Sequence, residues 1–137
     1  MSSPKIKLDE IFDVAILRHG FHSNNRDYFF LIETNWTEGK AGQYILKFKD
    51  CFELTYEVKH KDFENLDWDG NWTLAYPGFK DIPNNNETKS WEKGSGIRLY
   101  SVELETEIYR MKFIYSEYGL QKINNNDSLI NKAFFYP

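Results

Sequence analysis

The feature that most constrains this fold is a period-two alternation of side-chain character over residues 43–59. Apolar side chains occupy the even positions from Tyr44 to Val58, while Lys, Glu and Thr occupy most of the odd positions. The only break on the apolar side is Asp50. Because successive side chains of a strand point to opposite faces, the pattern predicts antiparallel β structure with one buried and one solvated face.

The alternation keeps the same parity on both sides of Asp50 and Cys51. The chain therefore either bends at this point or reverses in a tight turn. Unchanged parity favours a bent continuous strand or a bulge. Cys51 has no second cysteine with which to pair, and we expect an inert thiol in a reducing compartment.

Length and composition set the class of protein. A chain of 137 residues with 11 Phe, 9 Tyr and 4 Trp can bury a sizeable core, and we expect one β domain over residues 1–137. The formal charge of −4 argues against nucleic-acid binding through a basic surface and favours a basic or neutral partner. Since no apolar run approaches the length of a membrane span and no signal sequence is recognised, we expect a cytoplasmic protein without membrane contact.

Other strands are indicated by shorter patterns. Residues 14–22 are predicted to form one strand, and residues 28–32 a second strand that is apolar throughout and therefore central and covered on both faces. Residues 97–104 and 108–115 are predicted to form a hairpin, because the apolar parity switches across the intervening Glu105–Glu107 segment.

Three short helical segments are also indicated. Asp9 and Asp62 are each placed to cap a helical turn, and Asn86 is placed to cap a longer one. In that last helix we expect Trp91 to be the anchoring residue and Gly94 to provide the left-handed ending.

Together these segments predict a mainly β fold, an antiparallel sandwich or half-open barrel of about eight strands with two or three helical turns. The residues expected in its core are Phe30, Ile32, Leu46, Phe48, Phe52, Leu54, Tyr56, Val102, Leu104, Met111 and Phe113.

One segment resembles a calcium loop. Asn65, Asp67 and Asp69 fall at its first, third and fifth positions, with glycine at the sixth. The twelfth position, which requires a bidentate Glu, is Tyr76. A polar turn is therefore the favoured interpretation, and we expect no metal and no cofactor.

The sequence contains no recognisable catalytic motif. His19 and His22 lie three positions apart in a predicted strand, so they should face opposite sides and not form a ligand pair. An active site assembled in space stays open as an alternative, with His60 or the pair Asp67 and Asp69 as acid and base. The favoured expectation is a protein that is not an enzyme.

An acidic and aromatic cluster is the main candidate for partner binding. Its members are Glu64, Asp67, Trp68, Asp69 and Trp72, which would combine aromatic anchors with carboxylates suited to a basic protein surface. A solvated acidic face is the alternative interpretation.

The tryptophans leave a second alternative open. Trp36, Trp72 and Trp91 could line a site for a small ligand or carbohydrate, but a core position is the favoured interpretation for each.

Three segments carry a family resemblance. They are the run from Gln43 to Glu53, the Tyr76-Pro77-Gly78 turn with the later Ser90-Trp91 pair, and the strand from Glu105 to Phe113. These residues resemble the YxiG-like family of small, largely uncharacterised bacterial proteins. The resemblance implies no catalytic residues, since the matching positions belong to strands and turns. It implies association with polymorphic-toxin loci, and hence an immunity-type inhibitor of a bacterial toxin as the leading hypothesis.

Overall fold

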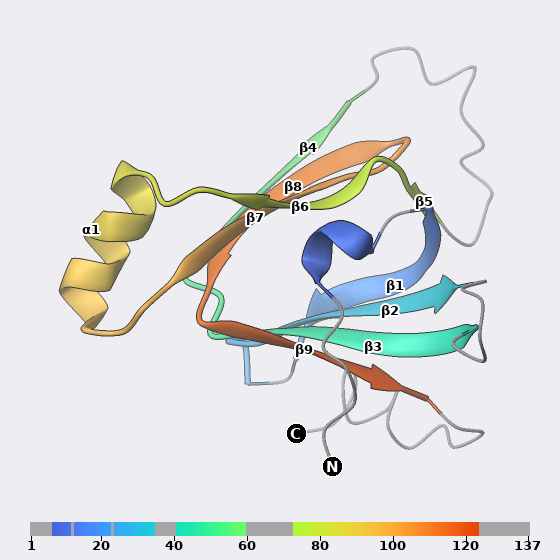
Figure 1. The fold of residues 1–137 in the computed structure, drawn as a ribbon, viewed down its shortest axis with the longest axis horizontal. Helices are drawn as coiled ribbons and strands as arrows, with labels where there is room; N and C mark the ends of the chain where they lie inside the picture. The colour runs from blue at the N-terminus through green and yellow to red at the C-terminus, as the bar shows by residue number, and fades with distance from the viewer. Residues whose placement is uncertain (1–6, 12, 23, 35–40, 60–72, 124–137) are drawn as a thin grey trace.

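The computed structural model describes residues 7–11, 13–22, 24–34, 41–59 and 73–123. These residues form two antiparallel sheets packed as a sandwich (Figure 1). The five-stranded sheet has the order β5-β1-β2-β3-β9, and the four-stranded sheet has the order β4-β8-β7-β6. In chain order the described elements are η1 (Leu8–Glu10), β1 (Val14–Phe21), β2 (Tyr28–Thr34), β3 (Gly42–Lys49), β4 (Glu53–Val58), β5 (Thr73–Ala75), β6 (Gly78–Ile82), α1 (Asn86–Ser95), β7 (Tyr100–Glu105), β8 (Tyr109–Tyr115) and β9 (Glu117–Lys122).

The alternating run is bent, as its unchanged parity predicts. β3 belongs to the five-stranded sheet and β4 to the four-stranded sheet, and the chain turns between them at Asp50, whose φ of 52° is left-handed. β8 and β9 change sheets in the same way at Ser116. Since β3 pairs with β9 and β4 pairs with β8, one long antiparallel ribbon runs through both sheets.

Hydrogen bonds join the two bends. The Ser116 amide donates to the Lys49 carbonyl oxygen at 2.9 Å, and the Ser116 hydroxyl lies 3.1 Å from Asp50 Oδ2. The hydroxyl also donates to the Lys49 carbonyl oxygen at 3.1 Å, so it helps to satisfy a backbone group that the bend removes from the strand ladders. The bends therefore hold the sheets in one fixed relation.

β2 is central and covered on both faces, which confirms the prediction from its continuous apolar run. Phe30 and Ile32 are fully buried in the main core between the sheets. Phe29 and Leu31 point to the opposite side and form a second apolar cluster with Ile45 of β3. The five-stranded sheet is thus apolar on both of its faces at β2 and β3.

Most of the expected core is confirmed. Eight of the expected residues are buried, and they are Phe30, Ile32, Leu46, Phe48, Val102, Leu104, Met111 and Phe113. The expectation was wrong for Tyr56, which is 52% exposed, and too strong for Phe52 and Leu54, which are half-buried. The reason is that β4 is an edge strand that diverges from the five-stranded sheet toward its end (Figure 1). Its apolar side loses the opposing layer that would cover it.

The helical segments lie close to their predicted positions with shifted ends. η1 begins after Lys7, so Asp9 lies within the turn and does not cap it. The cap of α1 is Asn85, whose side-chain oxygen accepts from the Thr88 amide at 2.9 Å. The left-handed C-cap is Gly96, with φ 77°. Neighbouring asparagines have the same capping preference, and so do nearby glycines, so the sequence does not distinguish which one ends the helix. The packing of the folded chain decides it.

The predicted hairpin is confirmed, since β7 and β8 pair antiparallel. Thr106 stabilises its turn, because its Oγ1 accepts from the Tyr109 amide at 2.9 Å. The predicted turn at Asp62 lies outside the described residues. Among the described residues, no helix is long and apolar enough to cross a membrane.

Candidate functional site

The residues predicted to bind a partner lie outside the described part of the chain. This holds for Glu64, Asp67, Trp68, Asp69 and Trp72. Asn65, the first ligand of the calcium-type loop, also lies outside the described residues, as do His60 and Trp36. Within the residues that are described, no group of three or more His, Cys, Asp or Glu side chains could hold a metal ion.

A different surface stands out among the described residues, on the outer face of the four-stranded sheet. Strand register places Arg110 of β8 between Glu57 of β4 and Glu105 of β7. The next row places Lys112 between Thr55 and Glu103. Opposite charges directly across a strand pair attract each other. We call Thr55, Glu57, Glu103, Glu105, Arg110 and Lys112 the charged face.

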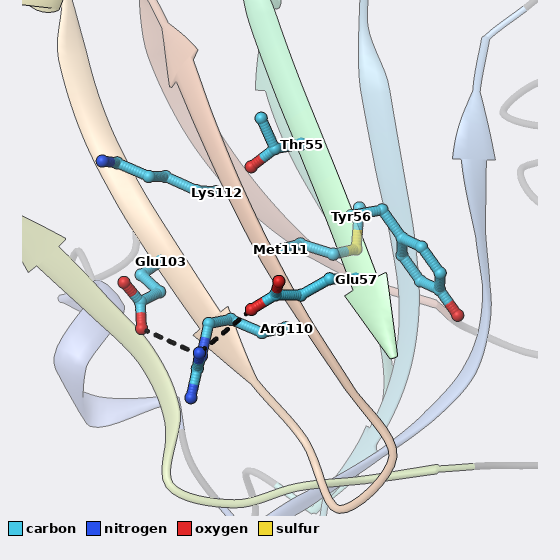
Figure 2. A pocket seen from close by; sticks show the side chains of 7 residues that line it. All are labelled: Thr55, Tyr56, Glu57, Glu103, Arg110, Met111 and Lys112. Atoms are coloured by element: carbon cyan, nitrogen blue, oxygen red, sulfur yellow. Dashed lines mark hydrogen bonds and ion pairs between the residues drawn. The ribbon is translucent and has the colours of Figure 1, made fainter. Parts of the chain in front are cut away.

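Arg110 is the centre of the charged face. Its Nη1 donates to Glu57 Oε1 at 3.1 Å, its Nε lies 3.7 Å from Glu103 Oε1, and its Nη2 lies 3.9 Å from Glu105 Oε2. This guanidinium lines an open pocket of about 240 Å³, to which Tyr56 and Met111 also contribute. Figure 2 shows how these side chains lie. Three carboxylates from two strands therefore surround one cation.

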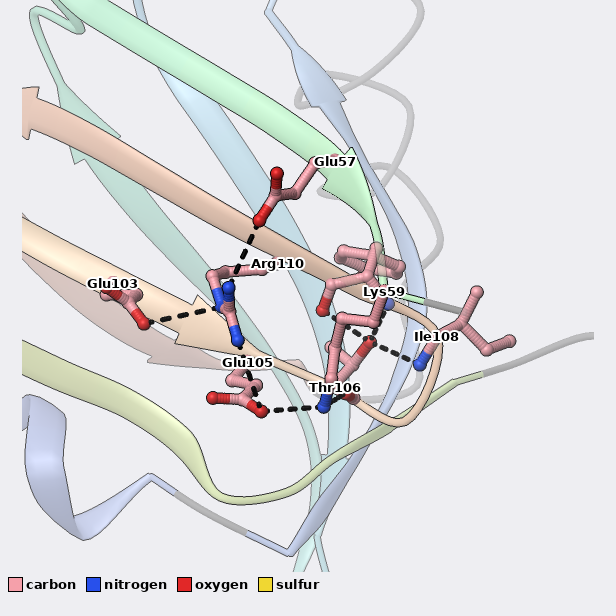
Figure 3. A network of polar contacts seen from close by, with 8 residues as sticks. Glu57, Lys59, Glu103, Glu105, Thr106, Ile108 and Arg110 are labelled. Atoms are coloured by element: carbon pink, nitrogen blue, oxygen red, sulfur yellow. Dashed lines mark hydrogen bonds and ion pairs between the residues drawn. The ribbon is translucent and has the colours of Figure 1, made fainter. Parts of the chain in front are cut away.

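Lys59 extends this network beyond the end of β4 (Figure 3). Its Nζ lies 2.6 Å from Glu105 Oε2 and also donates to the Thr106 carbonyl at 2.9 Å. The hydrogen bond from Lys59 is the main reason that the pKa of the Glu105 carboxyl lies below its usual range; burial acts against it, and the charges of Lys59 and Arg110 add to the lowering. Glu105 is therefore ionised at neutral pH.

The charged face is open to solvent. The Glu57 side chain is 65% exposed, that of Arg110 is 43% exposed and that of Glu103 is 36% exposed. Lys112 makes no ion pair with the described residues, and Figure 2 shows its side chain directed away from Arg110. The surface thus offers ordered carboxylates around Arg110 and an unpaired ammonium beside them.

Helix α1 borders this face at one end. Trp91 Nε1 donates to Glu53 Oε2 at 2.9 Å, and the Trp91 ring centroid lies 5.6 Å from that of Phe52. The expectation that Trp91 anchors the helix is confirmed by these contacts, although the ring is still 41% exposed. Its indole N–H is engaged, so a ligand would have to compete for it.

The two described histidines lie on opposite sides of the five-stranded sheet, as predicted. The His19 ring stacks on Phe30 of the main core, whereas the His22 ring contacts Phe29 on the outer side. His19 Nδ1 lies 2.6 Å from the Tyr28 hydroxyl, and burial lowers the pKa of His19. His19 is thus a neutral, hydrogen-bonded histidine at the edge of the core.

Cys51 has the properties of an unreactive thiol. It is half-buried, and its Sγ lies 3.6 Å from the Glu53 carbonyl oxygen. Burial raises the pKa of the thiol to about 11, so the nucleophilic thiolate is scarce at neutral pH.

The charged face was not singled out from sequence, although a signal for it existed. Glu103, Glu105, Arg110 and Lys112 alternate with apolar residues on the two strands of the predicted hairpin. In the observed hairpin register, Glu103 lies opposite Lys112 and Glu105 lies opposite Arg110. The contribution of Glu57 could not be read in the same way, because β4 and β8 are far apart in sequence.

The model of the YxiG-like protein family matches residues 52–132, more than half of the chain. The chain belongs to the YxiG-like family. No curated protein shows significant similarity to it. The matched segment begins at Phe52, so it includes every strand of the four-stranded sheet, helix α1 and the whole charged face.

Proposed function

We propose that this YxiG-like protein is a non-enzymatic binding protein that contacts another protein through its charged face. The observation that carries the proposal is the arrangement of Glu57, Glu103 and Glu105 around Arg110 on a solvent-exposed sheet surface. Such a flat, ordered array of charges suits recognition of a complementary protein surface.

The alternative explanation is that these ion pairs only stabilise the sheet. Exposed ion pairs contribute little to stability, typically between 0 and about 1 kcal/mol each. The same groups have a greater effect in a complex, because they steer encounter and fix orientation. Mutual ion pairing also holds Arg110 and Glu57 in place beforehand, so that less side-chain entropy is lost on binding.

The partner that best fits the proposal is a basic or neutral protein, and more specifically a bacterial toxin domain that this protein would inhibit as an immunity factor in the cytoplasm. Family membership and the formal charge of −4 support this choice. Glu64, Asp67, Trp68, Asp69 and Trp72 follow Lys59 in the chain and stay proposed as a second contact region.

The test begins with the genes that neighbour the one encoding this protein. A toxin domain encoded there should co-purify with the protein, and calorimetry should give a measurable Kd. Glu57→Lys should weaken that Kd at least about tenfold, because a carboxylate facing the basic partner becomes a cation.

The matched control is Glu33→Lys, which makes the same charge change at an exposed β2 residue of the other sheet. It should change the Kd less than about twofold. If the two variants weaken binding equally, the charged face is not the contact surface. A protein that purifies alone and has no toxin gene nearby would remove the support for an immunity role.

A further inference from the structure

A second surface feature lies where β8 passes into β9. It is an open groove of about 470 Å³ that includes the Ser116 bend, and its lining residues differ from those of the charged face. Three tyrosines and two carboxylates contribute to it. The residues that matter for its chemistry are Asp81, Tyr100, Tyr115, Glu117 and Tyr118, and we call this feature the tyrosine groove.

The three tyrosine rings pack against one another, and those of Tyr100 and Tyr118 are accessible, whereas Tyr115 is 2% exposed. Tyr100 and Tyr115 are cross-strand partners, with ring centroids 6.0 Å apart and planes 34° apart. Tyr118 follows the bend at Ser116, and its ring is nearly perpendicular to that of Tyr115, at 75° and 6.4 Å. Tyr115 therefore supports the two accessible rings from below, and a cation in the groove would contact the rings of Tyr100 and Tyr118.

One accessible ring already attracts a cation of this chain. The guanidinium carbon of Arg98 lies 5.5 Å from the centroid of the Tyr100 ring. This distance is within the range of cation–π contact.

Three carboxylates near the groove have no cationic partner among the described residues. Asp9, Glu10 and Asp81 all act electrostatically on Tyr118, and none of them forms an ion pair with a described residue. Burial, together with the neighbouring Asp9, raises the pKa of Asp81. Glu117 differs, since it lies 3.7 Å from Lys49 Nζ. A cation in the groove would therefore relieve repulsion that the described residues leave uncompensated.

We propose that the tyrosine groove binds an organic cation, an alkylammonium or guanidinium group, with the rings of Tyr100 and Tyr118 beside it and Asp81 as its counter-charge. The cation has two possible sources with the same chemistry. It is either a lysine or arginine side chain of the protein partner, which rests on the proposed function, or a free small molecule, which does not.

The direct test is a titration of the full chain followed by NMR of its tyrosine rings. The probes are tetramethylammonium chloride and Nα-acetyl-arginine amide, with Nα-acetyl-citrulline amide as a neutral isostere and sodium chloride at equal ionic strength. The proposal expects saturable shifts of the Tyr100 and Tyr118 ring signals with the cations alone. Shifts that do not saturate below about 100 mM, or equal shifts with the neutral isostere, overturn it.

Two variants locate the binding. Asp81→Asn and Tyr100→Leu should each weaken cation binding at least about fivefold, since they remove the counter-charge and one ring. Tyr100 is already 40% exposed, so its replacement is compatible with folding. Tyr56→Leu, at a tyrosine that is 52% exposed outside the groove, is the matched control and should leave the Kd unchanged. If Asp81→Asn and Tyr56→Leu behave alike, the groove is not the site.

The same variants separate the two sources of the cation. If Asp81→Asn also weakens binding of the toxin domain, the cation belongs to the partner. If only binding of the free cations weakens, the ligand is a small molecule. Glu57→Lys, on the charged face, should leave tetramethylammonium binding unchanged, so that failure of the proposed function and failure of this site give different results.

Discussion

The outer faces of the two sheets differ in polarity and in exposure to solvent. On the five-stranded sheet, Phe29, Leu31 and Ile45 are buried at 9%, 7% and 4% exposure, with Leu17 and Ile123 packed beside them. On the four-stranded sheet, the corresponding face is the charged face. Apolar burial on the first contributes to stability, since it removes hydrocarbon from water. Exposed ion pairs on the second contribute little to stability and are available for recognition.

The difference follows from strand position and side-chain pattern. β2 and β3 lie in the interior of their sheet, and β2 is apolar at successive positions. β4 is an edge strand in which polar and apolar residues alternate. A sheet face carries ordered charges only where alternate residues of its strands are polar and the side chains of those residues are exposed to solvent.

The largest expected effect tests the apolar face. Ile45→Ala should lower the free energy of unfolding by about 2 to 4 kcal/mol, because it leaves a cavity among packed side chains. Lys112→Ala on the charged face should change it by less than about 0.5 kcal/mol. Urea denaturation of both variants measures the difference. Similar losses for the two would show that the faces do not differ in this way.

A smaller effect is expected where α1 meets the end of the charged face. Trp91→Phe should cost about 1.5 kcal/mol, since it removes the hydrogen bond from the indole N–H to the Glu53 carboxylate. Glu53→Gln removes the charge but keeps an acceptor, so it should cost less. A double-mutant cycle by urea denaturation should show coupling between the two positions. Additive losses would mean that the contact does not hold the helix in solution.

Replacement of Arg110 tests whether the ion pairs stabilise the sheet. Arg110→Met should cost about 0.5 to 1 kcal/mol, because Glu57, Glu103 and Glu105 lose their shared cation and repel one another. Added salt should reduce the loss by screening that repulsion. Denaturation at low and high ionic strength measures both effects. A loss of several kcal/mol would make the charged face a stability element like the apolar one.

The smallest expected effect is the pH dependence of the Lys59 and Glu105 pair. The folded-state pKa of Glu105 is depressed, so its contribution is fully present above the unfolded pKa, near 4.3, and is lost as the pH falls through the folded value. Lys59→Met should therefore flatten the stability profile below about pH 4.5 and leave its slope above pH 6 unchanged. Thermal melts between about pH 3 and pH 7 measure how stability depends on pH in the two proteins. If Lys59→Met leaves the slope of stability against pH unchanged below about pH 4.5, the prediction is wrong.

The sequence by itself determined the architecture of the strands. Alternation through Tyr44 and Val58 indicated a bent two-faced strand, the apolar run at Phe29 and Phe30 indicated a central one, and the parity switch around Thr106 indicated a hairpin. These are properties of neighbouring residues, because the pleat of a strand turns spacing directly into direction.

Only the tertiary structure decided which residues meet across the sheets. Tyr56 is exposed because β4 is an edge strand, Glu57 reaches Arg110 through a pairing of distant segments, and Tyr118 closes the groove because Ser116 bends the chain into the other sheet. None of these depends on local pattern. Strand order and long-range register decide them, and both arise from the packing of the whole chain rather than from the spacing of neighbouring residues.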